Sequence, residues 1–215
     1  MKHDDGEAQG RSDREKAVRA LLAYVLLPAW TIPGILDWYW HRETKIERNA
    51  GAHESVMHLL MEIEAGAGVM MALFCEIEAG VIAAMLAAAL LHEATVVWDV
   101  GYALPRRPIK QREQHTHSFL EAFPFTTTAL AALINPRQAR ALLGIGPEKP
   151  RLRLRPRRPP LSITATLAIV VMSGLAGFLP HVEELVRCLR AKPTLAPQPP
   201  PPQPPPQEAD LPLAI

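Results

Sequence analysis

The apolar positions of this chain fall into five runs of about 20 residues, separated by short polar segments. A helix of that length spans the hydrocarbon core of a bilayer. The runs predict membrane spans at about 17–40, 54–74, 80–104, 115–134 and 161–180. The pattern therefore predicts an all-α fold, that of a polytopic membrane protein.

The two ends of the chain do not share this pattern. Residues 1–16 are polar and charged without a cleavable signal pattern, and we expect them to be disordered. Residues 193–215 are rich in proline and should form an extended tail outside any core, which either binds a partner or serves as a spacer. The transmembrane domain then covers residues 17–190. The basic run at 151–158 either rests on anionic headgroups or is a solvated flank.

Charged and imidazole side chains interrupt the apolar runs at helical spacing. The second run begins with Glu54, His58 and Glu62, and the pattern E-x3-H-x3-E returns in the fourth run. On a helix such residues lie on one face, one turn apart. The members of the second copy are Glu113, His117 and Glu121.

Two further runs carry the same residue types. Asp37 and His41 are four residues apart at the end of the first run, and His92 and Asp99 share a face of the third. In the predicted topology all four helices bring a histidine and a carboxylate to the same half of the membrane. The fifth run brings none. We therefore expect four helices to form a bundle lined by histidines and carboxylates.

The cost of charge in lipid predicts that these groups meet. A charged residue near the centre of a membrane helix costs about 2.5–3.5 kcal/mol. Such residues normally face a bundle interior and mark function. Imidazole with carboxylate is the ligand set of iron, manganese and zinc, and four-helix bundles hold dinuclear sites in this way. We expect two iron ions, with manganese or zinc as alternatives; a hydrogen-bonded network without metal is the competing interpretation.

The candidate ligands take different roles in this hypothesis. Four histidines serve as terminal ligands, namely His41, His58, His92 and His117. Glu62 and Glu121, the last and deepest members of the two E-x3-H-x3-E patterns, are the candidate bridging carboxylates. The carboxylates that complete the shell are Asp37, Glu54, Asp99 and Glu113. His115 is either a ligand or an interfacial residue, and His181 is assigned to the interface.

Composition narrows the partners. The net charge of +1 gives no reason to expect a nucleic-acid partner, and the apolar runs make membrane lipid the surroundings of the chain. Cys75 and Cys188 fall at opposite membrane faces, so we expect no disulfide between them. The expected location is the inner (cell) membrane of a bacterium, with the orientation left open.

The cluster of histidines on one membrane face, over residues 37–121, resembles the integral-membrane histidine-motif di-iron enzymes, the desaturases, hydroxylases and alkane monooxygenases. That resemblance implies O2-dependent oxidation of an apolar or lipid substrate, with electrons from a soluble donor that would dock at the basic loop 106–112. The H-x3-H and H-x2-H-H boxes of those families do not occur here, so no catalytic residue is carried over. A metal or proton transporter or sensor, and a non-catalytic assembly subunit, are the alternatives.

Overall fold

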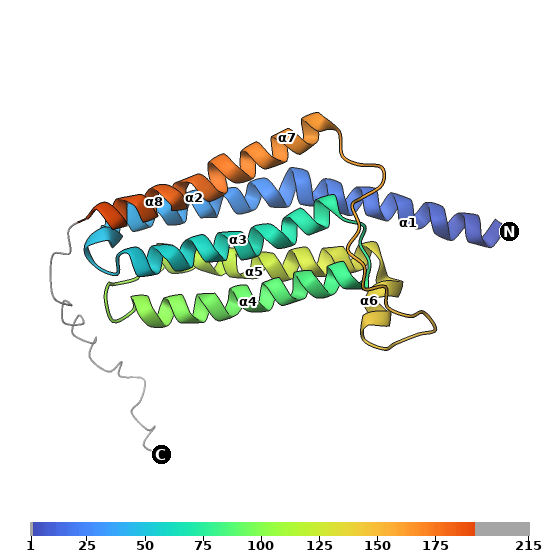
Figure 1. Cartoon of the computed structure of the whole chain (residues 1–215), viewed down its shortest axis with the longest axis horizontal. Coiled ribbons are helices and arrows are strands. Elements are labelled where there is room, and N and C mark those ends of the chain that lie inside the picture. The colour runs from blue at the N-terminus through green and yellow to red at the C-terminus, as the bar shows by residue number, and fades with distance from the viewer. Residues whose placement is uncertain (1, 192–215) are drawn as a thin grey trace, which may run out of the picture.

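The structure, a computed structural model, describes residues 2–191; the predicted proline-rich tail over 193–215 lies outside the described residues. The regular secondary structure of the described residues is helical, with no strand, as expected for an all-α fold (Figure 1). Its helices are α1 (Lys2–Leu21), α2 (Leu27–Thr44), α3 (Ala52–Phe74), α4 (Ala79–Ala103), α5 (Gln111–Ile134), α6 (Pro136–Leu142), α7 (Ile163–Met172) and α8 (Leu179–Arg190). Shorter segments are η1 (Leu22–Leu26), η2 (Ile46–Arg48) and η3 (Ser173–Phe178).

Four helical segments are long and apolar enough to cross a membrane. They are Ser12–Thr44, Ala52–Phe74, Ala79–Ala103 and Ile163–Arg190. Each of the four overlaps a predicted span, which supports a multi-pass membrane protein. The first begins before residue 17, and the structure describes a helix from Lys2 onward where we expected disorder up to residue 16.

The fourth predicted span, over 115–134, forms α5 but is not among those four segments. Its hydropathy is lowered by His117, Glu121 and a run of threonines. Helix α5 packs against α2, α3 and α4, so much of its surface faces protein instead of lipid. Thr127 and Thr128 are buried there and donate their hydroxyls to the carbonyl of Pro124. A helix with such neighbours needs less apolar surface than one surrounded by lipid.

Two prolines within the apolar segments do not end their helices. The π-helical segments η1 and η3 each lead into a helix whose first turn contains a proline, Pro28 in α2 and Pro180 in α8. Inside a continuous helix a proline leaves a carbonyl of the preceding turn without its N–H partner, and a local π-helical turn beside it accommodates this. We expected the fifth span to end at Pro180, but the helix continues to Arg190.

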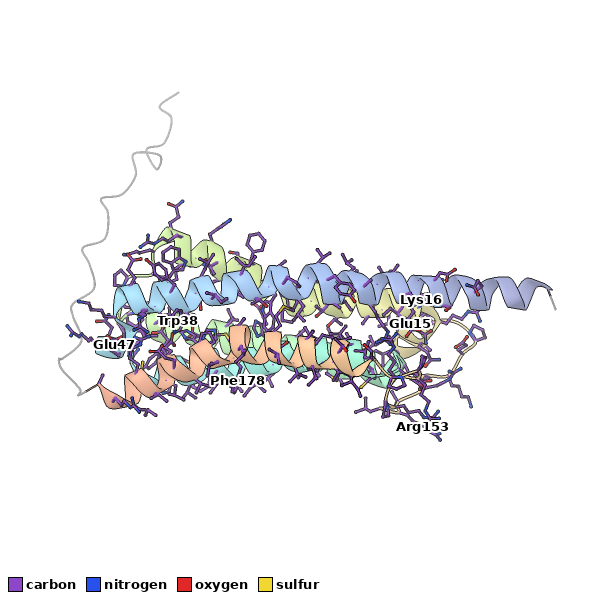
Figure 2. All side chains as sticks on the ribbon, turned by 90° about the horizontal axis from the view of Figure 1, so that it is seen from above. Glu15, Lys16, Trp38, Glu47, Arg153 and Phe178 are labelled. Carbon is purple, nitrogen blue, oxygen red and sulfur yellow. The ribbon has the colours of Figure 1, made fainter. Side chains whose placement is uncertain are left out.

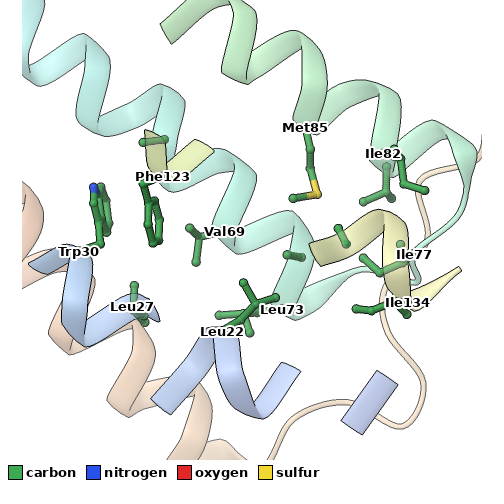
Figure 3. Close-up of a cluster of buried hydrophobic side chains, with 14 of the residues drawn as sticks. Leu22, Leu27, Trp30, Val69, Leu73, Ile77, Ile82, Met85, Phe123 and Ile134 are labelled. Atoms are coloured by element: carbon green, nitrogen blue, oxygen red, sulfur yellow. The ribbon is translucent and has the colours of Figure 1, made fainter. Parts of the chain in front are cut away.

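An apolar core fills one half of the bundle (Figure 3). Trp30 of α2 and Phe123 of α5 stack with ring centroids 5.0 Å apart and planes 7° apart. Beyond this pair lie side chains of η1, α3, α4 and α5. The labelled members include Leu22, Leu27, Val69, Leu73, Met85 and Ile134.

We call the end of the bundle at which α3 finishes the Phe74 end, and the end at which α2 finishes the Thr44 end. At the Phe74 end Arg19 caps α3: its guanidinium donates to the carbonyls of Ala72, Leu73 and Cys75, the last two at 3.1 and 2.9 Å. A cation at a helix C-terminus satisfies carbonyls that lack intrahelical partners.

The segment between α6 and α7 is also held at the Phe74 end. A Cβ at Gly80 would lie 2.6 Å from the backbone of Leu152, so only glycine permits this close approach. Gly80 donates its N–H to the carbonyl of Arg151 at 3.0 Å. Cys75 lies at this end and Cys188 near the other, and both are free, as expected.

Candidate metal centre

Histidines and carboxylates from five helices gather near the Thr44 end of the bundle. Each is at most 9% exposed, and four of them are fully buried. The residues are Asp37 and His41 of α2, Glu54 and His58 of α3, Asp99 of α4, Glu113 and His117 of α5, and Glu184 of α8, together with Arg107 from the segment between α4 and α5. We call these nine residues the cluster. Its convergence from α2, α3, α4 and α5 is the arrangement that the sequence predicted.

The centre of the cluster is a pair of stacked imidazoles. The rings of His41 and His58 lie 4.2 Å apart between centroids and 10° from parallel. The carboxylate of Glu184 joins them, because one oxygen lies 3.0 Å from Nδ1 of His41 and the other 2.9 Å from Nδ1 of His58. An ionised carboxylate only accepts hydrogen bonds, so both Nδ1 atoms donate.

With Nδ1 protonated, the Nε2 atom of a neutral imidazole is an acceptor. On His41 this atom lies 3.6 Å from Oδ2 of Asp37 and 3.4 Å from Oε1 of Glu113. His117 joins the same group, with its Nε2 2.8 Å from Oδ1 of Asp37. For His41 these are acceptors facing an acceptor, an arrangement that needs a proton or a cation between them.

The second ring has a matching set of neighbours. Nε2 of His58 lies 3.5 Å from Oδ1 of Asp99 and 3.8 Å from Oε1 of Glu54. The cluster thus consists of two half-sites, one built on His41 and one on His58. Glu184 serves both on their Nδ1 side. The short, parallel spacing of the rings makes the half-sites neighbours.

Arg107 connects the half-sites from the other side. Its Nε and Nη2 donate to Oε1 of Glu54 at 2.8 and 2.5 Å, and its Nη1 lies 2.5 Å from Oε1 of Glu113. Burial alone would lower the pKa of Arg107, but the hydrogen bonds and charges of Glu54 and Glu113 raise this pKa above its ordinary value. The guanidinium therefore stays charged and compensates part of the buried negative charge.

Several buried polar atoms of the half-sites have no hydrogen-bond partner among the described residues. Native proteins contain few such atoms, so each one indicates a partner such as a water molecule or an ion. They include Nε2 of His41, Nε2 of His58, Oδ1 of Asp37, Oδ1 of Asp99 and Oε2 of Glu113. Oδ1 of Asp37 belongs to this set although Nε2 of His117 lies 2.8 Å away. Within each half-site these atoms lie close together without hydrogen-bonding to each other, as the ligands of a bound cation do.

The ligand atoms are close enough to hold metal ions. Three groups of residues each offer ligand atoms that lie within 4.8 Å of one another inside the group. They are Asp37 with His41 and His117, Glu54 with His58 and Asp99, and His41 with His58 and Glu184. The first two groups correspond to the two half-sites. In the third, Glu184 bonds to Nδ1 of both rings, which is how outer carboxylates orient ligating histidines.

A cavity of about 40 Å³ adjoins the cluster on the side of the apolar core. A water needs about 10–15 Å³ by this measure, so the cavity holds a few small molecules. Cluster residues form one wall, and Trp30, Val96 and Leu120 form an apolar one. The remaining ionisable residues of the lining are Glu62, His92, Glu121 and His181.

Four of the predicted ligands lie outside the cluster. Glu62 and Glu121, expected to bridge the metals, line the cavity, and Oε1 of Glu62 lies 3.6 Å from Nε2 of His181. His92, expected to be a terminal ligand, is buried with Nδ1 3.3 Å from the carbonyl of Met61. His115 is exposed and packs against Phe119. Glu62 and Glu121 thus form part of the cavity wall, because the half-sites lie one helical turn nearer the Thr44 end.

Two cluster residues and one cavity residue were not predicted. Glu184 and His181 lie on α8, which we expected to contribute nothing, and His181 was assigned to the interface. The overlooked signal is the pattern His181, Glu184 and Cys188, which places three residues on one helical face if the helix continues past Pro180. All three are buried. Arg107 gave no comparable signal, because it lies in a basic loop whose other cations are solvated.

Comparison with known proteins gives no relative from which a role for this site could be inferred. No family model, no curated protein and no solved structure matches the chain.

Proposed function

We propose that the cluster binds two metal ions, and that the protein is a membrane-embedded dinuclear metalloprotein. The observation that carries the proposal is the charge of the cluster. With neutral imidazoles it holds five carboxylates (Asp37, Glu54, Asp99, Glu113 and Glu184) against the single guanidinium of Arg107, a net charge of −4 among these described residues. Buried charges persist only when paired or bound to metal. Two divalent cations neutralise this charge.

The metal-free alternative requires protonated imidazoles instead. Protonating His41, His58 and His117 would still leave the cluster one charge short of neutrality. It would also place two cationic rings, those of His41 and His58, face to face at 4.2 Å. Like charges at that distance in a buried site disfavour each other strongly. Metal ions on the two Nε2 atoms compensate the carboxylates directly.

The spacing of the half-sites supports a dinuclear arrangement. Because the stacked rings are nearly parallel and both direct Nδ1 at Glu184, their Nε2 atoms face the same side. The ring separation of 4.2 Å is close to the 3.5–4 Å between ions in two-metal sites. Carboxylates with imidazoles suit iron, manganese and zinc. Iron is our first choice, because bundles that supply carboxylates and histidines from facing helices commonly hold di-iron sites.

For the reaction, we favour O2-dependent oxidation of an apolar or lipid substrate, and electrons would come from a soluble donor. Iron would supply the binding and reduction of dioxygen. The protein would supply the cavity, whose walls are cluster residues on one side and Trp30, Val96 and Leu120 on the other. The apolar wall would contact an apolar group of the substrate beside the cluster, and Glu62, His92, Glu121 and His181 would complete the lining. The protein would then act from within the cell membrane of a bacterium.

A transport function finds less support. An ion path would need polar groups through both halves of the bundle. The apolar core instead fills the half toward the Phe74 end, where Leu27, Val69 and Leu73 are each at most 1% exposed (Figure 3). An assembly subunit with a metal-free polar core is the remaining alternative, and metal analysis separates it from our proposal.

The test is elemental analysis of detergent-purified protein, with an optical spectrum, after growth with added iron, manganese and zinc. We expect about two metal ions per chain. His115→Gln is the matched control, because this exposed histidine lies outside the cluster. It should leave the metal content unchanged, whereas His41→Gln should lower it. A wild-type content below about half an ion per chain would end the metal proposal.

A further inference from the structure

A second hollow, unrelated to the cluster, lies at the Phe74 end. It is a groove of about 650 Å³ between the α1–η1 segment and α7. Its floor and walls are mainly apolar and small, and include Ala20, Ala23, Tyr24, Ala168 and Met172. Only 11% of the most apolar stretch of the Ile163–Arg190 segment is buried, and α7 diverges from α3 in Figure 1, although Ile169 of α7 joins the apolar core.

The mouth of the groove is cationic. Lys16 and Arg157 line it, and Ser162 and Thr164 add hydroxyls at the beginning of α7. Lys16, labelled in Figure 2, is 70% exposed, and among the described residues its ion-pair partner is Asp13 at 3.8 Å. The two mouth cations come from separate segments, α1 and the linker before α7, and the fold brings them to one place.

The third cation that lines the groove, Arg19, is already bound to other groups of the protein. Arg19 lines the groove, but its guanidinium bonds to the end of α3 and to Glu15 at 2.8 Å. Arg157 is fixed through its backbone, because its N–H donates to the carbonyl of Phe74 at 2.7 Å. Ser162 caps α7, whose N-terminus adds partial positive charge to the mouth. The mouth therefore offers Lys16 and Arg157 to an anion.

The depth of the groove matches one leaflet of a bilayer. Its lining on the first helical segment extends from Lys16 to Pro28, about 18 Å at 1.5 Å per residue. Half of a bilayer's hydrocarbon core is about 15 Å thick. The cations thus lie at headgroup level when the apolar part lies in the hydrocarbon. An acyl chain follows such a path from one interface to the midplane.

The geometry points to a binding site for one anionic phospholipid. The phosphate contacts Lys16 and Arg157, and an acyl chain occupies the groove between α1–η1 and α7. Basic pockets between membrane helices bind anionic headgroups in this way. The site shares no residue with the cavity beside the cluster, so it does not depend on the proposed metal function.

The test compares lipids that differ in one property. Delipidated full-length protein in detergent is titrated with phosphatidylglycerol or with phosphatidylcholine of the same acyl chains, and retained lipid is counted by native mass spectrometry. We expect one phosphatidylglycerol per chain at concentrations where phosphatidylcholine is not retained. In the double variant Lys16→Gln/Arg157→Gln, phosphatidylglycerol affinity should fall about 30-fold, since each cation near the surface contributes about 1 kcal/mol.

Matched controls separate charge, chain and phosphate. Arg48→Gln/Arg190→Gln removes two exposed cations near the Thr44 end and should leave retention unchanged. Ala168→Trp fills the groove without altering charge and should abolish retention. Inorganic phosphate at millimolar concentration should not displace the lipid. Equal retention of both lipids, unchanged affinity in the Lys16/Arg157 variant, or displacement by inorganic phosphate would each overturn the proposal.

Discussion

His41 and His58 belong to different helices, yet their rings stack 4.2 Å apart and donate to opposite oxygens of one carboxylate, that of Glu184. This relationship fixes the orientation of both rings at once. It directs both Nε2 atoms at carboxylates that cannot donate to them. The cluster is therefore organised from α8 as much as from the helices that carry its histidines.

The first prediction concerns Glu184. In Glu184→Gln one oxygen becomes an amide NH2, which cannot accept from the second Nδ1–H. One ring must change its tautomer or orientation, and we expect metal affinity to fall 10–100-fold while the protein stays folded. Chelator competition on purified protein measures the change. Glu183→Gln is the neighbouring control, because Glu183 bonds to Trp38 and Arg42 outside the cluster; equal losses in both variants would contradict the assignment.

A second prediction separates ligands from cavity residues. Asp99→Asn should reduce metal content sharply, because Oδ1 of Asp99 faces Nε2 of His58 and has no hydrogen-bond partner among the described residues. Glu62→Gln and Glu121→Gln should retain metal, because both residues line the cavity beyond the half-sites. Metal counts on the three variants decide the matter. If Glu62→Gln or Glu121→Gln loses metal as Asp99→Asn does, the bridging roles expected from the sequence return.

The third prediction concerns Arg107. Replacing it by Gln leaves Glu54 and Glu113 buried without their cation, which typically costs about 3–5 kcal/mol. We expect a lower melting temperature in detergent for Arg107→Gln. Arg106→Gln is the control, because Arg106 packs on Tyr102 and contacts neither carboxylate. Metal should raise the melting temperature of Arg107→Gln more than that of wild type, since added cations replace the missing charge.

A fourth prediction addresses topology. The α6–α7 linker lies at the Phe74 end, whereas α8 finishes at the Thr44 end (Figure 1). Reporter domains inserted at Gly146 and fused after Arg190 should therefore report opposite compartments. A matched pair at Gly146 and Glu76, which is partly exposed, should report the same compartment, since both positions lie at the Phe74 end. Identical compartments for Gly146 and Arg190 would contradict a spanning α7–α8 segment.

Much of the cluster could be predicted because membrane helices make charge conspicuous. The four-residue spacing of Asp37 with His41 and of Glu54 with His58 fixes a face, and the cost of charge in lipid makes those faces meet. Depth was harder to predict. Spacing places Glu62 on the same face as His58, but only packing decides which turn of that face meets the other helices.

The contribution of α8 depended on one proline. If Pro180 ended the helix, Glu184 would lie outside the membrane-spanning segment. In the structure Pro180 follows the π-helical segment η3, and the helix continues through Glu184 to Arg190. A proline in an apolar run is compatible with either outcome, and the surrounding helices decide. Arg107 could not be assigned because its neighbours along the chain, Arg106 and Lys110, are also basic and interact at the surface.

The position of Glu184 in the last helix described has a consequence for biogenesis. Helices α2 to α5 are synthesised and inserted before α8, so for that interval their histidines lack the carboxylate that orients them. A centre assembled in this order acquires its ligand geometry only after α8 has joined the bundle. Metal loading would then follow insertion, and an incompletely synthesised chain would be kept from taking up a reactive metal.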